Sequence, residues 1–185
     1  MLPSTSIGFI EQMSIAAEVE VKTNFANEKS PNQMGLSTEF VTINDAQHEI
    51  VMIFRDQASS FKVLAATSNN NGEIWSQARI TNMPDSRAKQ SAGNFNNGTA
   101  FLINNPTGNK TRHPLVLTLS KDGRRFTDAF LLRDKSTLPP MHYKGKYKRI
   151  GYSYPKSIVW KNKIFVTYAV NKEDIAITQL DLSQF

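Results

Sequence analysis

The chain of 185 residues contains no cysteine. Disulfide scaffolds, thiolate metal sites and cysteine nucleophiles are therefore excluded, while the cellular compartment stays undecided because many exported proteins also lack cysteine. Histidine is scarce as well: His48, His113 and His142 lie far apart, without the i, i+4 spacing of a helical metal site. We expect neither a metal site nor a cofactor.

Long hydrophobic runs are also missing. No stretch approaches the roughly 20 apolar residues that cross a bilayer, so we expect no membrane partner. The N-terminus lacks a basic region and reaches Glu11 before a long apolar run forms, which predicts no signal peptide. The localisation stays unknown, and a secreted or periplasmic location is open to a longer parent protein. The net charge of +6 favours an anionic partner.

The pattern of apolar residues predicts an all-β protein. These residues occur in short β-branched and aromatic runs separated by Asn, Gly, Asp and Lys, and no long helical pattern is present. The expected strands are residues 17–22, 38–43, 50–55, 62–67, 99–104, 114–120, 130–133, 154–160, 164–170 and 174–182. Turn residues such as Asn96-Asn97-Gly98 lie between neighbouring runs and indicate antiparallel hairpins.

An internal repeat is visible when these hairpins are aligned. Two units end in similar turns, which begin at Ser68 and Ser120, and a third, incomplete unit begins near Tyr152. Three strands and a terminal hairpin in each repeat of about 40 to 50 residues are typical of the blades of a β-propeller.

The repeat endings follow the pattern Ser-x-Asn/Asp-x-Gly-x-x-Trp. The Asn70 or Asp122 side chain can bond the turn backbone, glycine supplies a left-handed conformation, and an aromatic residue anchors the turn. The sequence thereby resembles the Asp-box (BNR) repeats of the sialidase, or neuraminidase, superfamily. The resemblance implies a six-bladed propeller, of which residues 35–185 hold about three blades and residues 1–34 form an N-terminal segment with one expected strand. The chain resembles the C-terminal half of such an enzyme.

The resemblance also implies four site residues. Glu39 followed by Arg55 one hairpin later, and then Arg112 ahead of the strand that leads into the second Asp box, are similar to the ordered set of the family. Tyr152 is similar to its nucleophilic tyrosine. Tyr154 competes for this role, because alternation along a strand places residues two apart on the same face.

These residues imply a glycosidase acting on a terminal acidic sugar of a glycan. Two arginines can hold a carboxylate, and a tyrosine whose ordinary pKa is about 10 needs a base such as Glu39 to accept its proton. The family also uses a third arginine and an aspartate acid/base from earlier blades. The residues before Arg55 include no arginine and only one aspartate, Asp45. Enzymatic activity is therefore left undecided for this chain alone.

Alternatives stay open for each feature. The arginines could be strand-end residues paired with Asp56 and Asp122, Glu39 could be an exposed strand residue, and Tyr152 could be a core aromatic residue. The polar segment from residue 83 to 90 could be a loop that reaches the propeller mouth or a solvated connection. A noncatalytic carbohydrate-binding or interaction propeller would keep the Asp boxes without the Tyr–Glu pair. The basic run 142–149 contains tyrosines suited to nucleic acid, but no recognisable nucleic-acid-binding fold accompanies it, so we expect no such partner.

Three blades alone would leave two apolar faces uncovered. A soluble monomer rarely exposes more than a few hundred Å² of contiguous apolar surface. We therefore expect either a homo-oligomer or a missing N-terminal half that completes the propeller.

Overall fold

The structure is a computed structural model, which describes residues 11–13, 19–20, 34–42, 49–58 and 60–185. Its strands are β1 (Glu11–Met13), β2 (Val19–Glu20), β3 (Met34–Thr42), β4 (Ile50–Asp56), β5 (Lys62–Ser68), β6 (Arg79–Pro84), β7 (Ser91–Asn94), β8 (Ala100–Asn104), β9 (Leu115–Ser120), β10 (Arg125–Phe126), β11 (Asp128–Arg133), β12 (Tyr152–Trp160), β13 (Lys163–Val170) and β14 (Asp174–Asp181). Two short 3-10 helices, η2 (Lys135–Thr137) and η3 (Leu182–Gln184), are also present. No helix in the described ranges is long and apolar enough to span a membrane.

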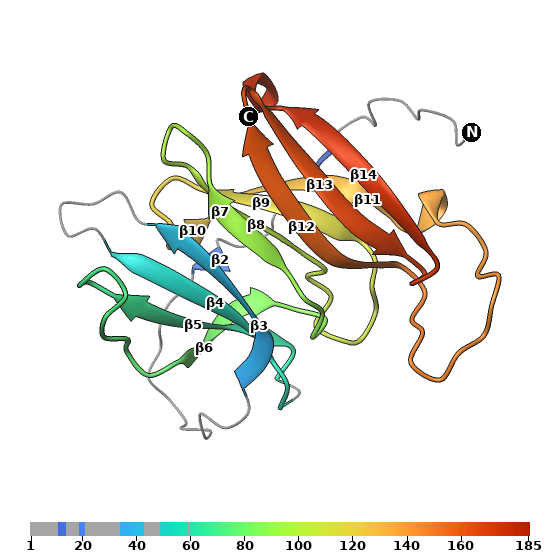
Figure 1. Ribbon diagram of the computed structural model, residues 1–185, viewed down its shortest axis with the longest axis horizontal. Coiled ribbons are helices and arrows are strands. Elements are labelled where there is room, and N and C mark those ends of the chain that lie inside the picture. The colour runs from blue at the N-terminus through green and yellow to red at the C-terminus, as the bar shows by residue number, and fades with distance from the viewer. Residues whose placement is uncertain (1–10, 14–18, 21–33, 43–48, 59) are drawn as a thin grey trace.

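Three antiparallel sheets form three blade-like units. Their strand orders are β3-β4-β5-β6, β7-β8-β9-β11-β1 and β12-β13-β14, and β2 pairs separately with β10. The three sheets lie side by side, and β7 contacts both β3 and β12 (Figure 1). The prediction of an all-β chain with about three blades is confirmed.

Of the two N-terminal strands, only β1 adds to the second sheet, and β2 forms a separate pair. β1 pairs with β11, and β2, which falls inside the strand expected at residues 17–22, pairs with β10. The remainder of that expected strand lies outside the described residues. Sequence patterns missed β6 (Arg79–Pro84), because its buried positions include the polar Thr81 while the apolar Ile80 is exposed.

The sheets are held together by two hydrophobic clusters. Between the first and second sheets, Val51 and Ile53 of β4 pack with Leu102 of β8. Between the second and third sheets, Phe101 and Ile103 of the same strand β8 share a cluster with residues of β12 and β13. Because side chains alternate along a strand, β8 faces both neighbouring sheets and is buried along its whole length.

Both Asp boxes form the expected closed turns. In the first, the Asn70 Oδ1 accepts the Ser68 hydroxyl at 2.8 Å and the Ile74 backbone N–H at 2.9 Å. In the second, the Asp122 Oδ1 accepts the Ser120 hydroxyl at 2.9 Å and the N–H groups of Arg124 and Arg125 at 2.8 and 2.7 Å.

The boxes stabilise the outer part of the blades. They connect β5 to β6 and β9 to β10. The sheets contact one another through β3, β7 and β12, each of which is an edge strand of its own sheet. Phe126, at the end of the second box, is buried between the first and second sheets. The boxes therefore have a structural role and lie apart from the candidate site.

The outward face of the third sheet is apolar and unpaired within the described part of the chain. Ile158, Trp160, Ile175 and Ile177 are 65%, 57%, 77% and 64% exposed. Residues on the opposite side of β13, including Ile164 and Val166, are fully buried against the second sheet. One face of this sheet is thus a packed core and the other is a hydrophobic surface.

We predict that the isolated 185-residue polypeptide associates through this face. Association would bury apolar surface and needs more than roughly 1,000 Å² of interface to be stable. Light scattering should report a dimer or larger species, and the double substitution of Ile158→Lys with Ile177→Lys should convert it to a monomer. Ile74→Lys, at an exposed position in the first Asp box, is the matched control and should change nothing. A dispersed wild-type monomer with cooperative melting would contradict the prediction.

Candidate functional site

Arg112 lies where the second sheet meets the third. Its backbone forms a bridge to Gly151, and its carbonyl oxygen accepts the Tyr152 N–H at 2.7 Å and the Asn105 side-chain amide at 3.1 Å. A Cβ atom on Gly151 would lie 2.5 Å from that carbonyl oxygen, so glycine, here at φ +121°, is required for this close approach. The start of β12 is therefore fixed to the Arg112 backbone.

The connection between β6 and β7 reaches the Arg112 side chain. The Arg112 Nη1 donates to the Ser86 hydroxyl at 2.8 Å, and both Ser86 and Asp85 are fully buried. Burial raises the pKa of Asp85, opposed by the Arg87 N–H that its carboxylate accepts at 2.8 Å and by the charge of Arg112. Burial lowers the pKa of Arg112, and the charge of Asp85 opposes this shift. The segment from residue 83 to 90 is thus packed against Arg112 rather than solvated.

Arg55 is near the end of β4. It is on the side of the strand that carries Val51 and Ile53, which pack toward the second sheet. With the Gln57 amide oriented so that its oxygen faces Arg55, that oxygen accepts Nε at 2.8 Å and Nη2 at 2.7 Å. The charge of Arg55 lowers the pKa of Arg112, which places the two guanidinium groups within electrostatic range of each other.

Tyr152 lies in the hydrophobic core between the second and third sheets. Its side chain is 2% exposed and packs edge to face on Tyr168, with ring centroids 5.6 Å apart. Its hydroxyl bonds the Thr137 hydroxyl at 2.9 Å and donates to the Asp134 carbonyl oxygen at 3.2 Å. Burial raises the pKa of Tyr152, so its hydroxyl is held in the neutral form. Although its backbone bonds that of Arg112, the Tyr152 hydroxyl is directed to Thr137 and Asp134 and not to the guanidinium groups of Arg55 and Arg112.

Tyr154 lies on the arginine side instead. Its ring is 40% exposed, and the Lys172 Nζ lies 5.1 Å from the ring centroid. Partial burial acts to raise the pKa of Tyr154. A hydrogen bond from Lys172 and the charges of Lys172, Arg112 and Arg55 more than offset that effect, so the pKa is lowered. The Tyr154 hydroxyl therefore loses its proton more readily than the Tyr152 hydroxyl, whose pKa is raised.

The expectation that Tyr152 and Tyr154 share one face of a strand is wrong, and a β-bulge is the reason. Ser153 pairs with Ala169 and Lys156 with Thr167, so two residues, Tyr154 and Pro155, oppose a single residue of β13. Tyr154 also has φ +59°, a left-handed conformation that is rare for an aromatic residue. Such strained positions cluster at functional sites.

Glu39 lies on β3, opposite Ile53 in the register with β4. This strand is at the edge of the first sheet and contacts β7, the edge strand of the second sheet. The position of its side chain lies outside what the structure describes, so the expected proximity of Glu39 to a tyrosine stays a prediction.

Sequence reasoning missed Lys172, which lies in the turn between β13 and β14. Asn171 and Lys172 both have positive φ, at 53° and 56°, and this turn places the Lys172 ammonium over Tyr154. A lysine in a polar turn carries no sequence signal for such a role, because the contact depends on where β13 ends relative to the bulge in β12. The described residues contain no group of three or more metal-ligating side chains.

Comparison with known proteins shows which family the chain matches. The family described as "BNR repeat-like domain" matches residues 1–166. Among solved structures, a protein titled "Sialidase" is 29% identical, with a TM-score of 0.66 over 80% of this chain and 13% of its own. No curated protein matches.

Two further structures share the fold at low identity. The Hadza microbial sialidase Hz136 is 12% identical, with a TM-score of 0.63 over 83% of this chain and 28% of its own. The intramolecular trans-sialidase from Ruminococcus gnavus, in complex with oseltamivir carboxylate, is 13% identical, with a TM-score of 0.55 over 80% of this chain and 32% of its own. This chain thus spans less than a third of the length of each of these structures. From its match over residues 1–166, the chain belongs to the family of BNR repeat-like domains.

Proposed function

We propose that this chain supplies part of the active site of a sialidase-like exo-glycosidase, which releases a terminal acidic sugar from a glycan. The observation that carries the proposal is that Arg55 on β4, Arg112 ahead of β9 and Tyr154 on β12 lie within electrostatic range of one another. The likeness to a sialidase at 29% identity supports it. An arginine pair beside a tyrosine with a lowered pKa combines recognition of a carboxylate with a reactive oxygen.

The arginines bind the carboxylate of the sugar in this proposal. A guanidinium group can form two parallel charge-assisted hydrogen bonds to a carboxylate, and each such bond contributes about 1.5 to 3 kcal/mol. Arg112 is preorganised for this role, because Ser86 and the nearby Asp85 hold its side chain before a ligand arrives. Arg55 is fixed similarly by the Gln57 oxygen.

Tyr154 is the nucleophile and Glu39 its base in this proposal. Sequence analysis gave the nucleophilic role to Tyr152, but a hydroxyl that is buried and bonded to Thr137 is poorly placed to attack a sugar. A neutral phenol avoids placing a second carboxylate beside an anionic substrate, which is the reason that sialidases depart from the usual pair of carboxylates. A covalent intermediate on Tyr154, hydrolysed in a second step, would retain the anomeric configuration.

A noncatalytic carbohydrate-binding propeller is the second candidate. It is favoured by the residues that precede Arg55, which include no arginine and only one aspartate, Asp45. The acid/base aspartate and third arginine of the sialidase scheme would have to come from elsewhere in a longer protein or from another chain. A binding propeller would retain ligand affinity without turnover.

We predict that Tyr154→Phe lowers kcat at least about a hundredfold while ligand affinity changes little, because the phenol oxygen is needed in the transition state rather than for binding. The measurement is hydrolysis of an aryl glycoside of an acidic sugar by the protein with its complete propeller. Tyr152→Phe is the matched control. It should cost about 1 kcal/mol of stability by removing a buried hydrogen bond and should leave kcat nearly unchanged. Full activity of the Tyr154 variant, or equal loss in both variants, would contradict the assignment.

We also predict that Arg55→Ala raises KM for an acidic glycoside about tenfold or more and spares the binding of an uncharged one, because it removes a charge that pairs only with the carboxylate. Arg112→Ala should have the same selectivity and also lower the melting temperature, because it leaves the buried Asp85 without its countercharge. Arg124→Ala, at the second Asp box, is the control for charge alone. A uniform loss for acidic and neutral glycosides would show that the arginines do not read the carboxylate.

A further inference from the structure

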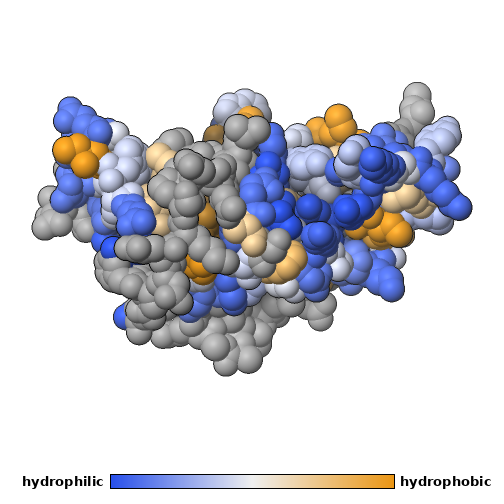
Figure 2. Space-filling model, turned by 90° about the horizontal axis from the view of Figure 1, so that it is seen from below, coloured by the Kyte–Doolittle hydropathy of each residue, from blue (hydrophilic) through white to orange (hydrophobic). Residues whose placement is uncertain are grey.

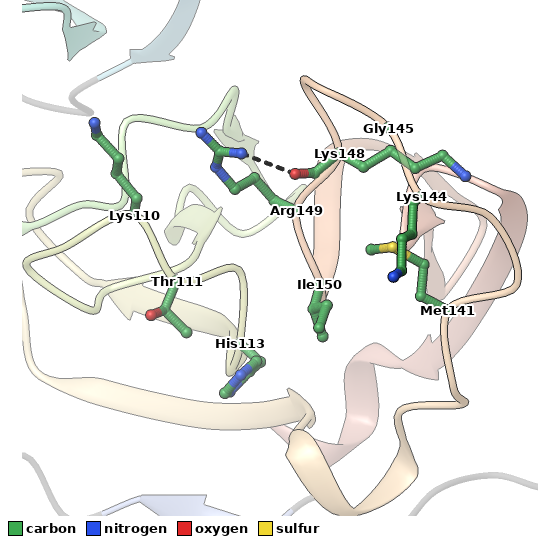
Figure 3. Close-up of a pocket in the computed structure, with 9 residues that line it drawn as sticks. All are labelled: Lys110, Thr111, His113, Met141, Lys144, Gly145, Lys148, Arg149 and Ile150. Carbon is green, nitrogen blue, oxygen red and sulfur yellow. Dashed lines mark hydrogen bonds between the residues drawn. The ribbon is translucent and has the colours of Figure 1, made fainter.

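A basic pocket lies beside the candidate site. The cavity of about 540 Å³ lies between the segment that precedes β9 and the long connection from η2 to β12 (Figure 3). It is lined by Lys110, Thr111, His113, Met141, Lys144, Gly145, Lys148, Arg149 and Ile150. Four of these side chains are Lys or Arg, and none is a carboxylate.

The loop that forms one wall is held in a fixed position by Glu173, in the turn between β13 and β14. The Glu173 carboxylate accepts the His142 N–H at 2.8 Å and the Tyr143 N–H at 2.7 Å, and it forms an ion pair with Lys148 at 2.5 Å. Hydrogen bonding by Lys148 is the main cause that lowers the pKa of Glu173 to about 2, so this anchor stays ionised at neutral pH.

The same turn holds the loop at two more points. The Lys172 ammonium donates to the Tyr147 carbonyl oxygen at 2.8 Å, and the Asn171 amide donates to the Pro139 carbonyl oxygen at 2.9 Å. The turn that places Lys172 over Tyr154 therefore also shapes the pocket. The pocket wall is preorganised, which lowers the entropic cost of binding a ligand.

The charges of the pocket are only partly compensated. Lys148 is paired with Glu173, whereas Lys110, Lys144 and Arg149 form no ion pair with any carboxylate in the described part of the chain. Seen from below, hydrophilic residues cover much of the centre and the right of the molecule, with hydrophobic residues among them (Figure 2). Three uncompensated cations around one cavity favour an anion.

The pocket adjoins the proposed carboxylate site. Lys110, Thr111 and His113 flank Arg112 in the sequence, and Arg149 precedes Gly151, which bridges the Arg112 backbone. The charge of Arg149 lowers the pKa of Arg112, so the two groups are within electrostatic range. A ligand held at Arg112 would thus present its next group toward the pocket.

We propose that this pocket is a second anion-binding subsite, which receives a sulfate or carboxylate carried by the sugar next to the terminal acidic sugar. The placement relative to the terminal sugar rests on the proposed function, whereas the binding of an oxyanion on a glycan rests on the pocket alone. Tyr143 and Tyr147, which are 73% and 74% exposed on the same loop, offer aromatic faces on which a sugar ring can stack.

Calorimetric titration of the full protein with four glycans tests the proposal. The probes are sialyllactose, the same trisaccharide with a sulfate on its galactose, disialyllactose, and lactose with a sulfate on its galactose, which has no acidic sugar. The added anion should raise affinity about tenfold over sialyllactose, and a gain with the sulfated or the disialylated probe identifies which oxyanion the pocket prefers. Lys110→Gln together with Lys144→Gln should abolish that gain, because each charge-assisted contact is worth about a factor of ten or more.

The sulfated lactose separates this proposal from the proposed function. It should bind the wild type and the Arg55→Ala variant equally and should lose affinity in the double lysine variant, even if the protein hydrolyses nothing. Lys121→Gln, an exposed lysine in the second Asp box, is the matched charge control and should change no affinity. Equal affinities for sialyllactose and both anionic derivatives, or no effect of the double variant, would overturn the proposal. So would tighter binding of a single-stranded thymidine oligonucleotide to the same lysines, since the loop would then serve nucleic acid.

Discussion

The close approach of Gly151 to the Arg112 backbone is the constraint on which the site depends. With a Cβ atom only 2.5 Å from the Arg112 carbonyl oxygen, any other residue would push the second and third sheets apart. This contact sets where β12 begins, and with it the positions of Tyr152 in the core and of the bulge that presents Tyr154. A backbone contact thus decides which tyrosine meets the arginines.

The candidate site contains buried polar and charged side chains as well as partly exposed ones. The buried Ser86 accepts a hydrogen bond from Arg112, the buried Asp85 acts on Arg112 through its charge, and Lys172 lies over the partly exposed ring of Tyr154. The turn between β13 and β14, which carries Lys172, also fixes the connection between η2 and β12 through Glu173. Arg112, Tyr154 with its lowered pKa and the adjoining cationic pocket therefore share a scaffold formed by the β6–β7 connection, the β13–β14 turn and the bulge in β12.

The sequence was sufficient to predict the fold. Short β-branched and aromatic runs and the turns at Ser68 and Ser120 predicted the blades, because these signals are local. Burial of Tyr152 and exposure of Tyr154 could not be read from alternation, since the bulge reverses it. Lys172 reaches Tyr154 from a turn of the same sheet, and Asp85 and Ser86 lie against Arg112 from the connection between β6 and β7. No short-range sequence pattern encodes these contacts.

Covalent trapping tests the central claim most directly. A fluorinated acidic sugar with a good leaving group slows hydrolysis of the intermediate, because the fluorine disfavours the oxocarbenium-like transition state. After reaction with the protein that carries its complete propeller, tryptic cleavage yields the peptide of residues 150–156, which holds both tyrosines. Fragmentation of this peptide should place the sugar on Tyr154. A label on Tyr152, or continued turnover with no labelled tyrosine, would contradict the account.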